Sequence, residues 1–184
     1  MPNASTNGHP KIGIASADQS SVASHPIQAI LSLGSSEGDR AGWLAFARDR
    51  LAEHSQIRLT GISPVIETDP IGAPAAYRSQ KYLNQVLVAE TTLSTDALSS
   101  LIHRIEADAG RKRGPIRNMP RTLDIDLIAF GDRIQQDPAL TLPHPRAKAR
   151  RFVLEPLAAL LPDYTFPDDP STTVSQLLAR LTNI

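Results

Sequence analysis

The chain has 184 residues, of which 41% are hydrophobic and 21% charged, so it is long and apolar enough to form one globular domain. Nineteen Lys and Arg residues balance nineteen Asp and Glu residues, and this zero net charge excludes a global field that would gather nucleic acid or an anionic membrane. The absence of cysteine excludes disulfides, thiolate metal sites and cysteine nucleophiles, and it suits a reducing cytoplasm.

Residues 1–26 are predicted to form a disordered tail. They are rich in Ser, Ala, Asn, Gly, His and Pro, and they show neither helical nor alternating apolar periodicity. The tail lacks the apolar run of a secretory signal, and the chain has no stretch of about 18 apolar residues, so we expect a cytoplasmic protein without a membrane partner. The folded domain is expected over residues 27–184.

The first half of this domain alternates strand and helix signals. Residues 27–33 form a mostly apolar run, which predicts a buried strand. Asp39 is placed to cap a helix whose apolar side chains recur at helical spacing as far as Leu51. Segments 57–68 and 82–92 carry the apolar and β-branched residues typical of strands, and each is predicted to form one strand.

The second half continues with a helix and a strand. Ser94 caps a predicted helix that ends at Gly110, and residues 123–130 have the apolar density of a strand. The order strand, helix, strand, strand, helix, strand is that of a ferredoxin-like α+β sandwich with a β-α-β-β-α-β core. Additional C-terminal helices are predicted around residues 152–161 and 174–181.

Asp124 and Asp126 are separated by one residue in a predicted strand, so their carboxylates project from the same face. Their mutual repulsion and the poor strand propensity of Asp favour a cation between them. Oxygen ligands suit Mg²⁺, which also binds substrate phosphates. The alternative is a solvent-facing strand edge with two aspartates that have no role; the apolar run at residues 127–130 favours the metal site.

A cluster of basic residues lies mostly between the second helix and the acidic strand. Guanidinium groups bind phosphate in two-pronged fashion, so arginines beside a carboxylate-held Mg²⁺ predict a polyphosphate site. The alternative is a basic surface loop, or a loop that binds nucleic acid. Neither a Gly-x-x-x-x-Gly-Lys loop nor a Gly-x-Gly-x-x-Gly motif is present, so any nucleotide would be held by arginines and metal. The basic residues are Arg104, Arg111, Lys112, Arg113, Arg117 and Arg121.

The segment at residues 120–131 reads PRTLDIDLIAFG, which looks like the signature of one protein family, the 6-hydroxymethyl-7,8-dihydropterin pyrophosphokinases (HPPK). Further segments match in the same order over nearly all of the chain beyond the tail, and the resemblance implies the same ferredoxin-like sandwich. These segments are LSLGSS (31–36), ETDPIG (67–72), YLNQVLV (82–88), RIEADAGR (104–111), LPHPR (142–146) and RRFVLEPL (150–157).

The resemblance implies an enzyme, a transferase of folate biosynthesis. It would transfer pyrophosphate from ATP to the hydroxymethyl oxygen of a reduced pterin and leave AMP, with two Mg²⁺ ions bridging the ATP phosphates. We expect a monomer whose partners are ATP and the reduced pterin, with no nucleic acid. Two alternatives remain: a pterin-binding relative with weak or no turnover, and a ferredoxin-like module that binds nucleic acid. An aromatic content of 4%, with no aromatic residue in 123–129, argues against the second alternative.

The resemblance also implies roles for individual residues. Taken alone, His144 is more often a structural residue, and an aromatic pair is often simple core packing. The catalytic candidates are Arg111, Arg121, Asp124 and Asp126, of which the two aspartates are the Mg²⁺ ligands. The ATP-binding candidates are His103, Glu106, Arg111, Arg113, Arg121, Thr141, His144 and Arg150. The pterin-binding candidates are Tyr82 and Phe152, which would stack on the ring, Asn84, which would read its edge, and the backbone at Thr68 and Ile71.

The chain departs from the family pattern at four places. Ser36 replaces an Asn, His103 stands where Gln is common, Pro145 replaces an aromatic residue, and Asn118-Met119 replaces Trp-Gly. We expect the loop at residues 110–120 to fold over the phosphates, and the missing Trp to weaken its closing.

Overall fold

A computed structural model describes residues 25–72, 74–111 and 119–182, and its centre is an antiparallel sheet of five strands. The strand order is β2-β4-β1-β5, and β3 also pairs with β4, which agrees with the predicted ferredoxin-like sandwich. Of the predicted tail, only His25 and Pro26 are described, so its disorder stays a prediction. The strands are β1 (Ile27–Ser35), β2 (Ile57–Ile62), β3 (Ile66–Thr68), β4 (Tyr82–Thr91) and β5 (Asp124–Phe130).

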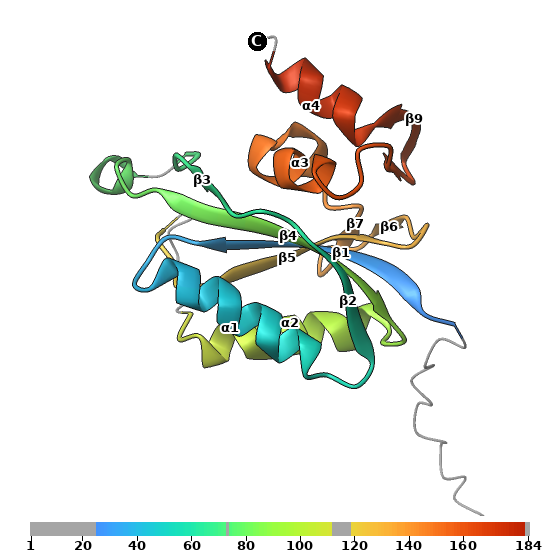
Figure 1. Cartoon of the computed structure of the whole chain (residues 1–184), viewed down its shortest axis with the longest axis horizontal. Coiled ribbons are helices and arrows are strands. Elements are labelled where there is room, and N and C mark those ends of the chain that lie inside the picture. Colours follow the sequence, from blue (N-terminus) through green and yellow to red (C-terminus); the bar gives the residue numbers. More distant parts are fainter. Residues whose placement is uncertain (1–24, 73, 112–118, 183–184) are drawn as a thin grey trace, which may run out of the picture.

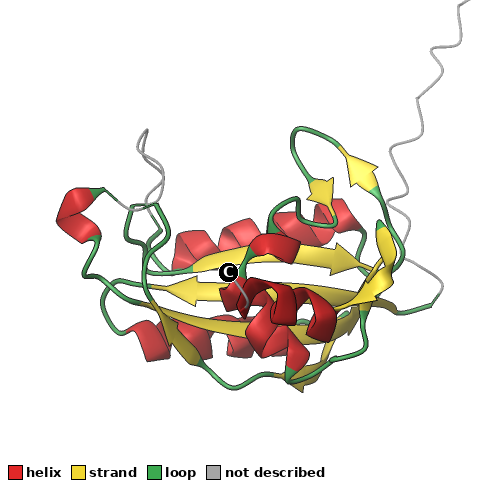
Figure 2. Ribbon diagram, turned by 90° about the horizontal axis from the view of Figure 1, so that it is seen from above, coloured by secondary structure: helices red, strands yellow, loops and turns green. Residues whose placement is uncertain are grey.

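Helices lie on both faces of this sheet (Figure 1). One face is covered by α1 (Arg40–Ala52) and α2 (Thr95–Asp108), and α3 (Arg151–Ala158) and α4 (Val174–Thr182) lie over the other. Viewed from above, α3 and α4 leave part of the sheet open (Figure 2). The remaining short elements are η1 (Ala75–Tyr77), η2 (Ala147–Ala149), and two hairpins, β6 (Gln135–Gln136) with β7 (Thr141–Leu142) and β8 (Thr165–Phe166) with β9 (Asp169–Thr173).

The predicted helix caps are confirmed, and one predicted strand is divided. The Asp39 carboxylate accepts a hydrogen bond from the Gly42 N–H, and the Ser94 hydroxyl accepts one from Ala97. The single strand predicted over residues 57–68 is two strands, β2 and β3, which pair successively with β4. The break lies at Ser63 and the following proline, where a backbone N–H is missing and the ladder cannot continue.

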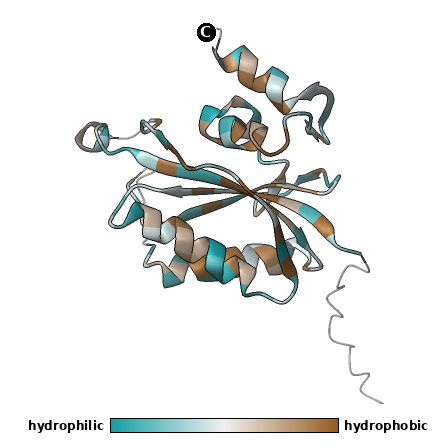
Figure 3. Ribbon diagram, viewed as in Figure 1, coloured by the Kyte–Doolittle hydropathy of each residue, from teal (hydrophilic) through white to brown (hydrophobic). Residues whose placement is uncertain are grey.

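Two apolar cores follow from the alternation of side chains along the strands. On β1, Leu31 and Leu33 pack with α1 and α2, whereas Ile30 packs with α3 and α4. Apolar and hydrophilic residues are interleaved along α1 and α2, as expected for helices with one face on a sheet (Figure 3). On the face toward α3, Ile30 is followed by Ser32 and then Gly34, so the apolar surface ends where these helices no longer cover the sheet.

The same change from apolar to polar occurs on the neighbouring strands. On β4 the face toward α3 carries Val86 and then Asn84, and on β5 it carries Ile128, Asp126 and then Asp124. The strand register places Gly34 of β1 directly between Asn84 of β4 and Asp124 of β5. Three adjacent strands therefore become polar at the same end of the sheet.

A buried polar network lies on the opposite face, beneath this polar end. Gln85 is 3% exposed; its amide oxygen accepts a hydrogen bond from Arg48 of α1 at 2.9 Å, and its amide nitrogen donates to the Ser63 carbonyl at 2.7 Å. The Ser63 hydroxyl accepts from the Val86 N–H at 2.9 Å. The network ties α1 to the break between β2 and β3, and so supports the position of β3 beside Asn84.

Replacing Gln85 by Leu tests this network. The side-chain volume is nearly kept, but Arg48 and the Ser63 carbonyl each lose a partner, so the free energy of unfolding should fall by about 1–3 kcal/mol. Urea denaturation of the ligand-free protein measures the change. Gln136→Leu, on the exposed strand β6, is the matched control and should shift the free energy by less than about 0.5 kcal/mol. Equal effects of the two substitutions would contradict the structural role of Gln85.

Candidate active site

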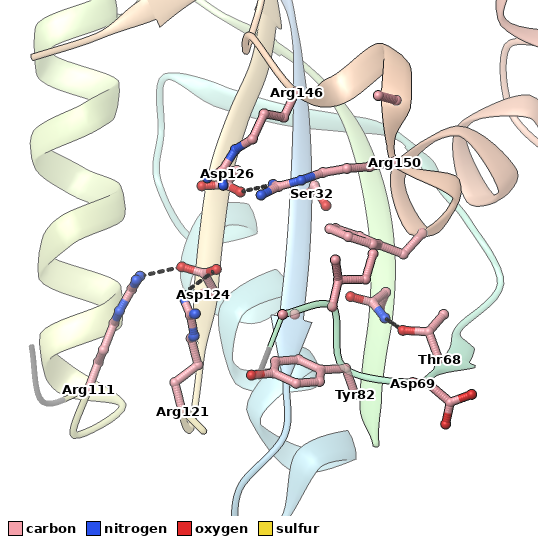
Figure 4. Close-up of a pocket in the computed structure, with 16 residues that line it drawn as sticks. Ser32, Thr68, Asp69, Tyr82, Arg111, Arg121, Asp124, Asp126, Arg146 and Arg150 are labelled. Carbon is pink, nitrogen blue, oxygen red and sulfur yellow. Dashed lines mark hydrogen bonds and ion pairs between the residues drawn. The ribbon is translucent and has the colours of Figure 1, made fainter. Parts of the chain in front are cut away.

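A cavity of about 730 Å³ opens at the polar end of the sheet (Figure 4). Its lining comes from segments far apart in the chain: strands β1, β4 and β5, the segment after β3, and the start of α3. The lining residues divide into two groups. The charged half contains Arg111, Arg121, Asp124, Asp126, Arg146 and Arg150, and the aromatic half contains Thr68, Ile71, Tyr82, Asn84 and Phe152.

Gly34 forms the floor between the two halves. Its Cα is paired with Asn84 on one side and Asp124 on the other. A Cβ at this position would lie 3.4 Å from the Asn84 amide oxygen, at the tight end of ordinary contact. The central strand therefore separates the two halves by a bare backbone rather than by a side chain.

Asp124 holds two arginines in the charged half. Its carboxylate oxygens lie 2.6 Å from Arg111 Nη1 and 2.8 Å from Arg121 Nη1 (Figure 4). The side chain is 25% exposed and faces the cavity, unlike a solvent-facing aspartate on a strand edge. The cations that face this carboxylate in the protein are guanidinium groups supplied by the end of α2 and by the segment just before β5.

Asp126 has looser contacts than Asp124. Its carboxylate lies 3.5 Å from Arg150 Nη1 and 3.9 Å from His144 Nε2. Burial, followed by the charge of Asp124, raises the pKa of Asp126 to about 6. A cation bound between the two carboxylates would relieve this repulsion.

His144 lies behind Asp126 and does not line the cavity. Its backbone N–H donates to the Ile128 carbonyl at 2.8 Å and fixes the loop to β5. Burial, and then the charges of Arg150 and Arg146, lower the pKa of His144 to about 4. The imidazole is therefore neutral at neutral pH and can take part in hydrogen bonds, but it adds no positive charge to the site.

Glu106 and Ser36, which do not line the cavity, hold Arg111 and Arg121 in place. Glu106 of α2 is buried; its carboxylate pairs with the Arg111 guanidinium and accepts a hydrogen bond from the Ile125 N–H at 2.8 Å. Ser36 exchanges hydrogen bonds with the backbone of Arg121, from Ser36 N–H to the Arg121 carbonyl at 3.0 Å and from Arg121 N–H to the Ser36 hydroxyl at 3.1 Å. The residue that departs from the family pattern at position 36 thus still positions a predicted catalytic arginine.

The aromatic half brings the predicted aromatic pair to one cavity. Tyr82 comes from β4 and Phe152 from α3, and each is only partly buried. Phe152 also packs against the core beneath α3, so core packing and cavity lining coexist in this residue. The Asn84 amide donates to the Thr68 hydroxyl at 2.8 Å, which fixes the amide plane at the cavity wall (Figure 4).

Comparison with known proteins agrees with this geometry. The sequence model of a family described as 7,8-dihydro-6-hydroxymethylpterin-pyrophosphokinase (HPPK) matches residues 30–162. The chain belongs to the HPPK family. It is 38% identical over 133 residues to a 2-amino-4-hydroxy-6-hydroxymethyldihydropteridine pyrophosphokinase of Bacillus subtilis (strain 168), covering 72% of this chain and 77% of that protein.

A second relative and a solved structure extend the comparison. A 2-amino-4-hydroxy-6-hydroxymethyldihydropteridine pyrophosphokinase of Pseudomonas aeruginosa is 36% identical over 138 residues, which cover 75% of this chain and 83% of the relative. A wild-type Plasmodium falciparum HPPK-DHPS crystal structure with pterin and p-hydroxybenzoate superposes with a TM-score of 0.66 at 14% identity. That match covers 86% of this chain and 43% of the Plasmodium chain, and it shows that the two share a fold.

Some residues predicted for the HPPK site lie elsewhere. His103 is exposed on α2, and Thr141 of β7 is partly buried, and neither lines the cavity. Arg113 and Asn118 lie outside the described residues, as does most of the loop predicted to close over the phosphates, so those expectations stay predictions. Lining residues that sequence reasoning did not single out are Ser32, Gly34, Asp69, Gly72, Arg146 and Ala149.

Asp124 and Asp126 are the described residues best placed to hold a metal ion. In residues 25–72, 74–111 and 119–182, no three His, Asp or Glu side chains converge into a protein-only metal cage. Two carboxylates are nevertheless the donor set that suits Mg²⁺, which keeps waters and takes its other ligands from substrate phosphates. The donor set therefore fits an ion that is bound together with a phosphorylated substrate.

Because Asp124 and Asp126 differ in their contacts, neutralising each of them should change the free energy of unfolding of the metal-free protein differently. Asp124→Asn should lower the free energy of unfolding by about 1–2 kcal/mol, because two short ion pairs are weakened in a partly exposed site. Asp126→Asn should leave it unchanged or raise it, because a carboxylate with loose partners and a repelling neighbour is neutralised. Denaturation in the presence of EDTA measures the free energy of unfolding of both variants. A larger loss in Asp126→Asn than in Asp124→Asn would contradict the assigned ion pairs.

Proposed function

We propose that the cavity transfers the pyrophosphoryl group of ATP to the hydroxymethyl oxygen of 6-hydroxymethyl-7,8-dihydropterin, and so serves folate biosynthesis. Membership of the HPPK family supports this activity, and the two halves of the cavity suit the two substrates. The observation that carries the proposal is the row formed by Asn84, Gly34 and Asp124 across three strands. This row sets a polar, aromatic-lined slot directly beside a cluster of carboxylates and guanidinium groups.

The charged half suits the triphosphate chain. Attack by the hydroxymethyl oxygen on the β-phosphorus forms the new O–P bond, and the bond from that phosphorus to the oxygen bridging the α-phosphate breaks, so AMP leaves. Arg111 and Arg121 are placed to bind the phosphates that are transferred and to stabilise the charge that spreads over their oxygens. Because Glu106 and Ser36 already hold these two residues, little reorganisation is needed when the substrate binds.

Mg²⁺ is the ion we propose for the Asp124 and Asp126 carboxylates, with two ions bound together with ATP. When bound, it would neutralise phosphate charge. Arg111 and Arg121 lie against Asp124 and would therefore lie beside an ion held by this carboxylate. Arg150 lies on the other side of the pair, beside Asp126, where it can bind the same chain from the α3 side.

The aromatic half suits the pterin. A flat heteroaromatic ring is bound well by aromatic faces and by paired donors and acceptors at its rim. Tyr82 and Phe152 supply the faces, and the Asn84 amide, oriented by Thr68, supplies the rim contacts. The exposed side chain of Ile71 lies at the mouth, where its backbone is open to the ring edge.

The remaining expectations about partners concern nucleic acid, membrane and assembly. Among the described residues, no helix has the length and apolar character needed to cross a membrane. Helices α3 and α4 cover much of the sheet face that a ferredoxin-like nucleic-acid-binding module would use, which supports the absence of nucleic acid. A monomeric, cytoplasmic enzyme stays our prediction.

The activity is tested by measuring AMP formation from ATP and the hydroxymethyl pterin, with Mg²⁺ present or removed by EDTA. Asp124→Asn and Asp126→Asn should each lower turnover by orders of magnitude, because the phosphate charge loses its bridging ions. Asp132→Asn, on the exposed turn after β5, is the matched control and should leave turnover unchanged. Near-normal activity of either cavity variant, or turnover without a divalent ion, would contradict the metal assignment.

The pterin half is tested by binding each ligand separately. Tyr82→Ala, Asn84→Ala and Phe152→Ala should each weaken pterin binding by roughly 1–3 kcal/mol and affect binding of an ATP analogue much less. Isothermal calorimetry measures both, with Tyr77→Ala on η1, outside the cavity lining, as the control. Equal losses for both ligands would mean that these side chains support the core rather than the pterin.

A further inference from the structure

Arg146 lines the charged half of the cavity and has no role in the preceding proposal. It lies just before η2, and its backbone N–H donates to His144 Nδ1 at 3.2 Å. Figure 4 shows its side chain at the same end of the cavity as Asp126 and Arg150, away from Tyr82 and Thr68. Arg146 therefore enters the charged half from the η2 side, whereas Arg111 and Arg121 come from the end of α2 and the segment before β5.

The Arg146 guanidinium has no partner of opposite charge in the described part of the chain. The other arginines of the cavity are paired with carboxylates, Arg111 and Arg121 with Asp124 and Arg150 with Asp126. No carboxylate among residues 25–72, 74–111 and 119–182 comes within ion-pair distance of Arg146. An arginine side chain carries five N–H donors and no acceptor, so its donors remain available for an anion that enters the cavity.

Arg146 is exposed, and it lies at the cavity wall beside a second arginine. That arginine is Arg150, four residues later in the chain, which lines the same cavity. Two like charges held beside each other at a cavity wall repel, and the repulsion is removed when both bind one polyanion. One anion that enters the cavity could therefore be bound by Arg146, which has no carboxylate partner in the described part of the chain, and by Arg150, which lies 3.5 Å from Asp126.

We propose that Arg146 is a further phosphate-binding residue, which contacts the polyphosphate chain of the nucleotide from the α3 side of the cavity. The inference rests on the proposed function, because that function places a triphosphate between Asp124, Asp126 and the surrounding arginines. With Arg146 included, the polyphosphate would be bound by two pairs of arginines. Arg111 and Arg121 come from the segments after α2 and before β5, and Arg146 and Arg150 come from the segment around η2. The pterin, which offers no phosphate, is not a ligand of this residue.

Arg146→Gln tests the proposal by equilibrium binding. The probe is an ATP analogue with a methylene group in place of the α–β bridging oxygen, with Mg²⁺ present, and inorganic tripolyphosphate is the second probe. Loss of one charge-assisted contact should weaken binding of each probe roughly tenfold or more, and pterin affinity should be unchanged. Arg146→Lys should bind with intermediate affinity, because it keeps the charge but loses the planar fork.

Arg133→Gln is the matched control. Arg133 is exposed on the turn after β5 and does not line the cavity, so this variant removes the same charge at a distance. Its affinity for both probes should stay within about twofold of wild type, since exposed charges at such distances are screened by salt. The melting temperature of Arg146→Gln should equal that of the wild type, because the guanidinium has no carboxylate partner to lose.

Three results would overturn the proposal. The first is a nucleotide affinity of Arg146→Gln within about twofold of the wild-type affinity. The second is an equal loss of nucleotide affinity in Arg133→Gln, which would indicate only a long-range effect of charge. The third is a melting temperature of Arg146→Gln well below that of the wild type. Failure of the proposed function is separate from these, because wild-type protein would then form no AMP while the binding comparison still decides the role of Arg146.

Discussion

Two carboxylates on one face of a strand, at the polar end of a sheet that is otherwise largely apolar, are the constraint on which the structure depends. Charges in such a position are stable only if they are paired and hydrogen-bonded. Asp124 meets this condition with Arg111 and Arg121, from the end of α2 and the segment before β5, whereas Asp126 has only a looser contact with Arg150 at the start of α3. The chain thus brings three separate segments to one edge of the sheet.

The arginines are themselves held from behind, which makes the cluster a preorganised site rather than a loose set of surface charges. Glu106 is buried and joins Arg111 to the backbone of β5. Ser36 joins the turn after β1 to the backbone of Arg121, and the Gln80 amide donates to the Ser36 carbonyl at 2.5 Å. A cation that must be ready for a phosphate is best placed by contacts that the phosphate does not disturb.

The features that the sequence predicted correctly are those that depend on residues close together in the chain. Apolar alternation and the caps at Asp39 and Ser94 located the main strands and helices, because these signals act over a few residues. The same alternation placed Asp124 and Asp126 on one face. These features were available from the sequence because each is decided by near neighbours in the chain.

What could not be predicted depends on contacts between distant segments. Pro64 marks the break between β2 and β3, but the position of β3 also depends on Ser63, whose hydroxyl accepts a hydrogen bond from the Val86 N–H of β4, more than twenty residues later. Gly34 became part of the site only through its register with two other strands, and Arg146 only through the position of η2 over the sheet. The short hairpins β6–β7 and β8–β9 have only two paired positions each, too few for an alternation to be recognised.

Asn84 and Gln85 are consecutive on β4, yet they face opposite sides of the sheet and belong to different parts of the molecule. Asn84 is tied to Thr68 at the cavity wall, and Gln85 is tied to Arg48 and Ser63 in the layer beneath. Substitutions at positions 84 and 85 in homologous proteins should therefore be independent of each other. In a set of diverging homologues, position 85 should vary together with position 48, because an apolar residue at one of these positions leaves a polar group at the other without its partner.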